Sequence, residues 1–509
     1  MIFRTSLTQH LDNPRLTPSE RAELRCRLAR ELEEAGDYGG AREALGTLWR
    51  GVGVRPALDG LEGFAASEVL LRAGVLTGWL GHADQVKDSQ EAAKNLISEA
   101  ARRFGSLGAP QKVQEAQIEL AYCYWREGAF DEARVILDEV LEGLPGDGEL
   151  KAKAVVRRVI VERGAYREAL SILNRHAPLF EKITNHTILG GYHNELAIAL
   201  RNVGTSENRE DFVDRAFVEY AAASYHFEQA GHDSYRARVE NNLGFLHFKA
   251  GRYREAHGHL DVARRLLLGL HDAGSVAQVD ETRARVFLAE GRHTEAERVA
   301  RAAVATLEKG GRQWRLAEAL TTHGTALARL GRADDSRLTL YRAIEVAHQS
   351  GALNDAGLAA LAVLEELWAS LTYEELHAVY ERAHEWLTPS RHQETLHRLL
   401  RAANRLLTLG GREADEAEAR ALEGEAPETG TLREVMRRQE GRLIRRALQD
   451  ARGSVTQAAR TLGVSHQALI YMLEHRHKEL LDDRRPVVKR RRVAAPKRKG
   501  DDEQPGGLA

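Results

Sequence analysis

A short phrase built around glycine recurs along most of the chain, and no other feature of the sequence constrains the fold as strongly. Each clear copy has an aromatic residue two positions after the glycine and a small residue five positions after it. Four copies begin at Gly36, Gly128, Gly164 and Gly251, and weaker ones at Gly291 and Gly331. Each copy lies between segments whose apolar residues recur at spacings of three and four, the period of an amphipathic helix. The pattern predicts a series of helix pairs joined by short turns.

The residue types in the phrase have a physical reason. Glycine adopts the left-handed conformation that ends a helix at little steric cost. We expect the aromatic residue to pack beneath the turn and the small residue to let the second helix approach the first. The residues seven and four positions before the glycine also keep this register, as at Ala121 and Tyr124, Gly244 and His247, and Gly324 and Leu327. The register of the phrase therefore extends into the preceding helix.

These features resemble the tetratricopeptide repeat, a helix pair of about 34 residues. The glycines at 128 and 164 are 36 residues apart, and those at 251, 291 and 331 are 40 apart. The wider intervals 36–128 and 164–251 leave room for further units, for which 196–200 and 216–227 are candidates in the second interval. We expect an all-α superhelical array over 21–422, after an N-terminal segment 1–20. Its last part, 355–409, should be helical without the phrase.

Stacked helix pairs form a superhelix whose concave face usually binds a peptide or a protein segment. The first helix of each pair builds that face, and in some tetratricopeptide proteins asparagines and basic residues on it bind the carboxylates of the ligand. The candidates here are Asn194, Arg201, Arg238, Asn241 and Asn242. The alternative is that they are solvated polar positions without a ligand.

Charge is distributed unevenly along the chain. Between Thr431 and Gly500 there are 19 Lys and Arg against 7 Asp and Glu, out of 73 and 75 in the whole chain. The segment 423–430, rich in Glu, Gly, Pro and Thr, is typical of a linker. A basic end on an acidic body predicts a polyanionic partner for the end. We expect 481–509 to be a disordered basic tail, whose alternative roles are solubility or contact with RNA.

Three helices are predicted between the linker and the tail, over 431–480. Apolar residues recur at helical spacing from Leu432 to Asp450, and Gly453 should end this helix. Ser454 or Thr456 can cap the next helix by accepting a backbone hydrogen bond. Ala458 and Ala459 are small where two helices must cross closely.

A tight turn should follow at Gly463, with Val464 as its apolar plug and Ser465 as the cap of the third helix. Leu462, Leu469 and Leu473 are expected to close the core. Over 432–475 the segment resembles the DNA-binding domain of the Fis family, which also ends NtrC-type activators. The matching residues are Leu443, Ile444, Ala447, Leu448, Gly453, Ala458, Ala459, Leu462, Gly463, Val464, Ser465 and Leu469. The resemblance implies a helix-turn-helix that dimerises, with the helix from Leu432 as the candidate dimerisation element, and reads a major groove.

The third helix departs from the Fis pattern, because His466, Gln467 and the following apolar run stand where basic residues are usual. His466 and Gln467 can still reach base edges, and glutamine pairs well with adenine. Tyr471 is placed to bond a phosphate, whereas Met472 should pack. The candidate DNA contacts are Ser454, Thr456, Ser465, His466, Gln467, Ile470, Tyr471, Arg476, Lys489, Arg490, Arg491 and Arg492.

The sequence contains no phosphate-binding loop of the Gly-x4-Gly-Lys type, no His-Glu-x-x-His zinc motif and no Gly-x-Ser-x-Gly nucleophile turn. The pairs His257 and His259, and His475 and His477, are spaced by two, which on a helix points the rings apart. We interpret them as surface histidines. We therefore expect no enzymatic activity, no catalytic residue, no cofactor and no metal.

The two cysteines, Cys26 and Cys123, cannot build a disulfide framework, and the N-terminus has no secretory signal pattern. The expected protein is a bacterial transcription regulator in the cytoplasm, associated with the nucleoid. Its C-terminal domain should bind duplex DNA as a homodimer, and its array should bind a protein or peptide, with no membrane contact. The alternative is a protein-interaction scaffold that does not bind DNA and carries a charged tail.

Overall fold

The computed structural model describes residues 15–162, 164–310, 313–389, 393–423 and 432–481. The chain divides into two compact units, 1–410 and 411–509, and each is considered by itself. The described residues form helices and no strand, as the sequence predicts. No helix among them is long and apolar enough to cross a membrane.

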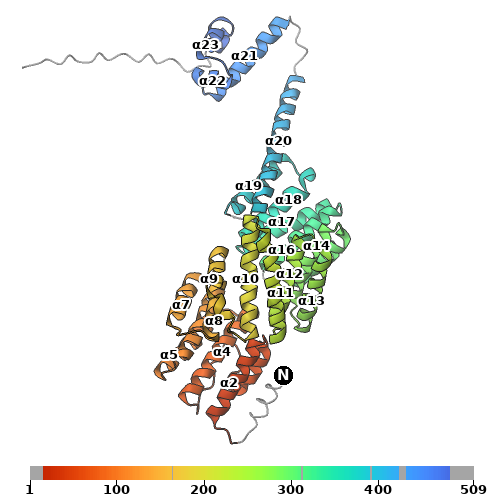
Figure 1. The fold of residues 1–509 in the computed structure, drawn as a ribbon. Helices are drawn as coiled ribbons and strands as arrows, with labels where there is room; N and C mark the ends of the chain where they lie inside the picture. Colours follow the sequence, from red (N-terminus) through yellow and green to blue (C-terminus); the bar gives the residue numbers. More distant parts are fainter. Residues whose placement is uncertain (1–14, 163, 311–312, 390–392, 424–431, 482–509) are drawn as a thin grey trace, which may run out of the picture. The chain divides into compact units, whose positions relative to one another are not determined.

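The first unit is an array of helix pairs, and the longer helix that follows them runs past the boundary at residue 410 (Figure 1). Consecutive helices pack against one another, which is the arrangement of tetratricopeptide repeats. In chain order the helices are α2 (Pro18–Glu34), α3 (Tyr38–Leu45), α4 (Gly63–Ala83), α5 (Ser89–Ser106), α6 (Pro110–Glu127), α7 (Phe130–Gly143), α8 (Glu149–Val161), α9 (Tyr166–Phe180), α10 (His186–Glu207), α11 (Glu210–Ala230), α12 (Asp233–Lys249), α13 (Tyr253–Gly269), α14 (Ala273–Ala289), α15 (His293–Leu307), α16 (Gln313–Arg329), α17 (Ala333–Gln349), α18 (Leu353–Glu366), α19 (Tyr373–Leu387) and α20 (Gln393–Glu423).

The turns have the geometry that the repeated phrase predicts. All six leading glycines have φ between 73° and 88°, and the small residues five positions later are buried at the helix crossings. Gly244 and Gly324, which lie seven positions before Gly251 and Gly331, have no space for a side chain. A Cβ on Gly324 would lie 2.6 Å from Leu340 Cγ, and one on Gly244 would lie 2.8 Å from Leu260 Cδ2. Glycine at these two positions therefore allows the two helices of a pair to touch.

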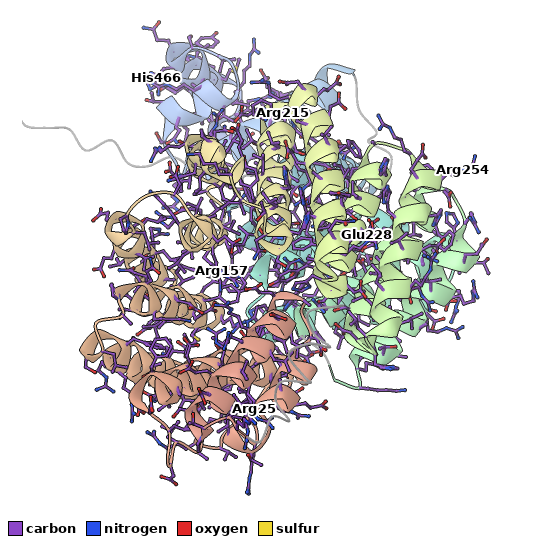
Figure 2. All side chains as sticks on the ribbon, turned by 60° about the horizontal axis from the view of Figure 1, so that its bottom comes forward. Arg25, Arg157, Arg215, Glu228, Arg254 and His466 are labelled. Atoms are coloured by element: carbon purple, nitrogen blue, oxygen red, sulfur yellow. The ribbon has the colours of Figure 1, made fainter. Side chains whose placement is uncertain are left out.

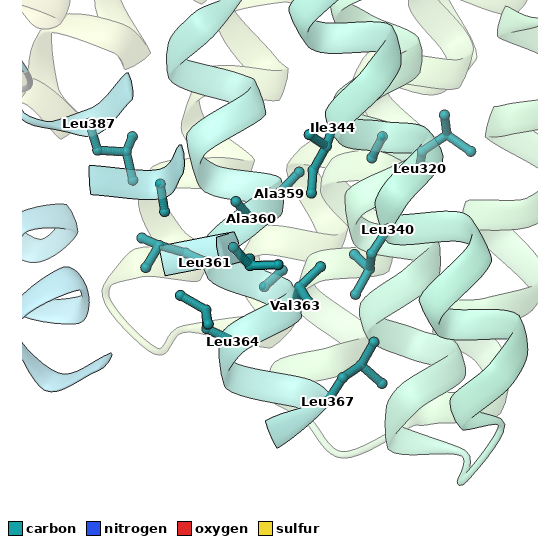
Figure 3. Packing of buried hydrophobic residues seen from close by; sticks show 14 of the residues in the cluster. Leu320, Leu340, Ile344, Ala359, Ala360, Leu361, Val363, Leu364, Leu367 and Leu387 are labelled. Atoms are coloured by element: carbon teal, nitrogen blue, oxygen red, sulfur yellow. The ribbon is translucent and has the colours of Figure 1, made fainter. Parts of the chain in front are cut away.

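The extra units expected in the wide glycine intervals are present as α4 with α5 and α10 with α11. The end of the array is also helical without the phrase, and α16 to α20 share one apolar core (Figure 3). Leu361, Val363, Leu340 and Leu387 are fully buried in it. A continuous core of this kind stabilises each pair through its neighbours.

The N-terminal part of the array curves until its first turn contacts helices from the middle of the chain. A Cβ on Gly36, in the turn between α2 and α3, would lie 2.4 Å from His232 Cε1, in the turn before α12. The rings of Trp79 on α4 and Tyr235 on α12 lie 6.5 Å apart between centroids. We call this contact between α2–α4 and α10–α12 the seam.

The second unit contains α21 (Leu432–Asp450), α22 (Val455–Thr461), α23 (His466–His475) and a short 3-10 turn (Lys478–Leu480). Its own core is made by Ile444, Ala447, Leu448, Ala451, Ala458, Ala459, Leu469, Leu473 and Leu480. The helix predicted over 432–450 is confirmed. The expected linker beyond Glu423 and the basic tail lie outside the described residues.

Candidate nucleic-acid interface and inner face of the array

Two left-handed turns set the geometry of α21, α22 and α23. Gly453 has φ 79° and its N–H bonds the Leu448 carbonyl at 2.7 Å, which ends α21. Gly463 has φ 66° between α22 and α23. The Ser465 side chain accepts a 3.1 Å hydrogen bond from the Ala468 N–H, so the predicted cap of α23 is confirmed.

The predicted side-chain cap of α22 is wrong. Ser454 occupies the N-cap position, but its side chain makes no capping hydrogen bond, and Thr456 lies inside the helix. The Ser454 carbonyl instead accepts the N–H groups of Gln457 and Ala458. Both side chains remain at the surface, Ser454 half-buried and Thr456 exposed.

Helix α23 has one buried face and one exposed face. Leu469 and Leu473 are fully buried in the core, whereas His466 and Gln467 are exposed in the first turn. The next turn of the exposed face carries half-buried Ile470 and Tyr471, whose side chain is 56% exposed. Residues four apart share a helix face. The exposed face of α23 is therefore available to a groove (Figure 2 labels His466).

The residues after α23 contact α21. Arg476 Nη1 lies 3.3 Å from Glu440 Oε1, and Arg437 donates to the Arg476 carbonyl at 2.7 Å. His477 is only 2% exposed, and its Nε2 lies 3.2 Å from Glu440 Oε2. The interpretation of His477 as a surface histidine is wrong, because α23 ends at His475 and the chain then turns inward.

Two further exposed arginines of this domain, Arg452 in the turn after α21 and Arg460 on α22, were not among the sequence candidates. Their proximity to the two turn glycines in sequence was the available signal. The predicted contacts Lys489, Arg490, Arg491 and Arg492 lie outside the described residues.

In the array, an aromatic and cationic cluster joins the N-terminal helices to α12. The Tyr38 and Trp79 rings stack with centroids 4.5 Å apart, and the Tyr122 centroid lies 5.5 Å from that of Trp79. Tyr235 approaches from α12, across the seam. We call these four rings, with Arg126, Arg157 and Arg238, the inner cluster.

Each arginine of the inner cluster lies against a ring. The guanidinium carbon Cζ of Arg157 is 3.7 Å from the Tyr122 centroid, and that of Arg126 is 4.0 Å from the Trp79 ring. Arg238 Cζ lies 4.7 Å from the Tyr235 centroid. None of the three forms an ion pair with a carboxylate in the part of the chain that the structure describes. In Figure 2, Arg157 lies between the N-terminal helices and those of the middle of the array.

Two of the five predicted partner residues adjoin this cluster or belong to it. Arg238 belongs to it. Asn194 on α10 is 1% exposed and donates at 2.8 Å to Glu195, whose carboxyl interacts electrostatically with Arg238 and Arg157. Asn241 lies one turn after Arg238. Its Oδ1, like that of Asn194, is buried and accepts no hydrogen bond from the described residues. Arg201 on α10 and Asn242 on α12 are half-buried, and neither has a buried side-chain atom that lacks a hydrogen-bond partner.

Arg126 and Arg157 were missed by sequence reasoning, as were their aromatic neighbours. The signal was a concentration of rings at Trp79, Tyr122, Tyr124 and Trp125 in a chain with only 6% aromatic residues. The described residues hold no group of His, Cys, Asp or Glu arranged to bind a metal ion. His257 and His259 are half-buried and pair with Glu290 and Glu240, so they too are not free surface histidines.

Residues 435–474 match the family described as "Bacterial regulatory protein, Fis family". No curated protein matches the chain in sequence. A Rap protein complexed with competence and sporulation factor resembles it with a TM-score of 0.46 and 12% identity, over 66% of this chain and 98% of that one. The quorum sensor NprR from B. thuringiensis gives 0.44 and 14%, over 67% and 91%.

A signal-transduction ATPase with a tetratricopeptide repeat sensor, from Pyrococcus horikoshii, gives a TM-score of 0.47 and 15% identity over 70% of this chain. The match covers only 56% of that longer protein.

Proposed function

We propose that the chain is a transcription regulator that binds duplex DNA through α22 and α23 and binds a protein or peptide through its array. The match of 435–474 to the Fis family carries the DNA-binding half of this proposal. Fis-family helices are presented to the major groove by the turn before them. The exposed first turn of α23, with His466 and Gln467, has the position that such readout requires.

The basic residues around this helix supply the attraction to phosphate. Arg452, Arg460 and Arg476 are exposed in the same domain, and the sequence adds Lys489 to Arg492. Phosphate contacts set position and affinity, whereas base contacts set sequence preference. In this proposal α23, the helix that contacts the bases, has a polar and nearly uncharged exposed face. The other exposed residues of the domain supply the positive charge.

We further propose that the C-terminal domain works as a homodimer through α21, where Leu443 is 56% exposed although it lies beside the domain core. The domain boundaries 21–422, 423–430, 431–480 and 481–509 are part of the same proposal. A protein that binds chromosomal DNA would act at the nucleoid, in the cytoplasm.

The test is selection of duplexes by the full-length chain from a random DNA pool, at two salt concentrations. We expect a preferred motif with two related half-sites, as a symmetric dimer requires. Enrichment without a motif would contradict base readout, and absence of any DNA binding would favour a scaffold.

A further inference from the structure

We propose that α20 pairs with α20 of a second copy of this chain, in a parallel coiled coil along Leu396, Leu400, Ala403 and Leu407. We call these four residues the stripe. The inference goes beyond the proposed function, because it concerns how two arrays associate and requires neither DNA nor a bound peptide. It adds a second interface to the one proposed on α21, and it starts from leucines that remain exposed at the end of the array.

Helix α20 has two apolar faces. Leu399 and Leu406 are buried in the core that α16 to α20 share. The second face carries Leu396, Leu400 and Leu407, which are 38%, 57% and 74% exposed. At 3.6 residues per turn, this face lies about 100° around the helix from the buried one. One apolar face is therefore used inside the array, and the other is open.

The open face has the spacing of a coiled coil. Apolar or small residues stand at consecutive positions separated alternately by four and three residues. In chain order they are Leu396, Leu400, Ala403, Leu407, Gly410, Ala414, Ala417 and Ala421. This alternation is the heptad pattern at which one helix meets another, and α20 continues beyond its last member to Glu423. The pattern indicates that the partner is an α-helix.

The position of α20 at the end of the array makes its exposed leucines unusual. Earlier in the array, the first helix of one pair packs against the first helix of the next, as α14 does on α16 and α16 on α18. No described helix follows α20 within the first unit. The last helices of a repeat array require a polar outer face for solubility. Leucines at this position therefore indicate a surface that a further helix covers.

The charges of α20 favour a second copy as the partner. Arg398 pairs with Glu365 of α18 at 2.7 Å, and Arg405 Cζ lies 4.2 Å from the centroid of the Trp368 ring. These two cations are thus held towards the array. The stripe itself contains no charged residue. Two identical stripes therefore meet without repulsion between like charges.

A parallel pair in register brings each residue of the stripe against its own copy. Leu400 then meets Leu400 and Leu407 meets Leu407, as the core positions of a coiled coil require. The glycine and alanines from 410 to 421 would also meet one another, and small residues let two helix axes approach closely. A partner of different sequence would have to reproduce this change from leucines to small residues. A second α20 has it by identity.

The first experiment measures the dissociation constant of the full-length chain by analytical ultracentrifugation, without DNA. Leu407→Glu places a charge within the stripe, and Leu407 is 74% exposed, so the core of the array is not disturbed. We expect the dissociation constant to rise at least about tenfold. Leu338→Glu is the matched control, because Leu338 is 73% exposed on α17 and lies outside the stripe. It should leave the dissociation constant unchanged.

The second experiment tests the register by cross-linking with a short bismaleimide. Leu407→Cys should give a covalent dimer, because the two copies of this position face each other in a parallel pair. Arg401→Cys should not, because Arg401 is exposed away from the stripe. The natural Cys26 and Cys123 are each 2% exposed, and burial raises the pKa of both thiols, so they should not react.

Four results would overturn the inference. A dissociation constant that rises for Leu443→Glu but not for Leu407→Glu would assign the dimer to α21 alone and leave the proposed function in place. Equal weakening by Leu407→Glu and Leu338→Glu would remove the stripe from the interface. A dimer that Leu407→Cys does not cross-link would refute the parallel register. A chain that stays monomeric would refute pairing through α20 and α21 alike, while selection of duplexes would still test DNA binding.

Discussion

Thr187 Oγ1 donates a 2.9 Å hydrogen bond to the Glu34 carbonyl, joining two helix ends that are 153 residues apart in the sequence. Together with the contact of Gly36 with His232, this bond closes the N-terminal part of the array on α10–α12. The seam brings Tyr235 and Arg238 next to Trp79, and so completes the inner cluster.

Gly36→Ala should open the seam. Its methyl group would lie 2.4 Å from His232 Cε1, in addition to the strain of φ 75°. Gly251→Ala is the control, because φ is 73° there but nothing lies within 4 Å of the added Cβ. We expect both to lose about 1–2 kcal/mol from the left-handed backbone and Gly36→Ala to lose about 1–3 kcal/mol more. Amide hydrogen exchange near 186–190 and 232–236 should rise for Gly36→Ala alone, and equal protection in both would disprove the closure.

Acid should weaken the same seam. Burial, together with repulsion from Arg238 and Arg157, lowers the pKa of His232 to about 3 from 6.5. Because the folded pKa lies below the unfolded one, the stabilisation is complete above about pH 6.5 and is lost as the pH falls towards 3. The slope is about 1.4 kcal/mol per pH unit.

The comparison is with His232→Asn, since asparagine also caps a helix but does not titrate. His232 Nδ1 accepts from the Tyr235 N–H, and the variant keeps such an acceptor. Thermal unfolding between pH 4 and 7 should depend on pH more steeply in the natural protein. If stability depends on pH equally in the natural protein and in His232→Asn, His232 is solvated in the folded state.

Gln467→Ala should reduce affinity for a selected DNA site by about 1–3 kcal/mol, the contribution of a bidentate base contact. Affinity for scrambled duplex should change little, and His466→Ala should behave similarly. Gln449→Ala is the control, an exposed glutamine at the end of α21. Competition between the selected and the scrambled duplex at fixed salt measures the ratio of the two affinities. If neither variant changes it, α23 does not read bases.

Deletion of 489–499 should weaken binding to every duplex alike. These residues lie outside the described part of the chain, and the expectation comes from their basic sequence. Each phosphate contact that is lost lowers the slope of log affinity against log salt by about 0.9. A slope equal to that of the full-length chain would remove the tail from the interface.

Cleavage within 423–430 should leave the array folded, because the C-terminal helices have their own core. Circular dichroism of the separated array should show an unchanged, cooperative melting curve. A loss of helix after cleavage would instead mean that α21–α23 cap the array.

The local features of this protein follow from its sequence because they depend on neighbours in the chain. Gly36 and Gly463 need left-handed turns, Ser465 caps the helix that follows it, and Ala459 is small at a crossing of adjacent helices. Periodicity and turn chemistry act over a few residues, so they determined the helix pairs and the helix-turn-helix without further information. The cap predicted at Ser454 failed because a backbone carbonyl accepted the bonds instead.

The inner cluster was decided by tertiary structure alone. Arg126 and Arg238 are 112 residues apart, and no local pattern places them on one surface. Their meeting depends on the small rotation between successive helix pairs, accumulated from α2 to α12, which packing sets and sequence spacing does not encode. The burial of His477 has the same origin, since it depends on where α23 ends relative to α21. The sequence by itself determined the units and their order, and the curvature of the array decided which of their side chains meet.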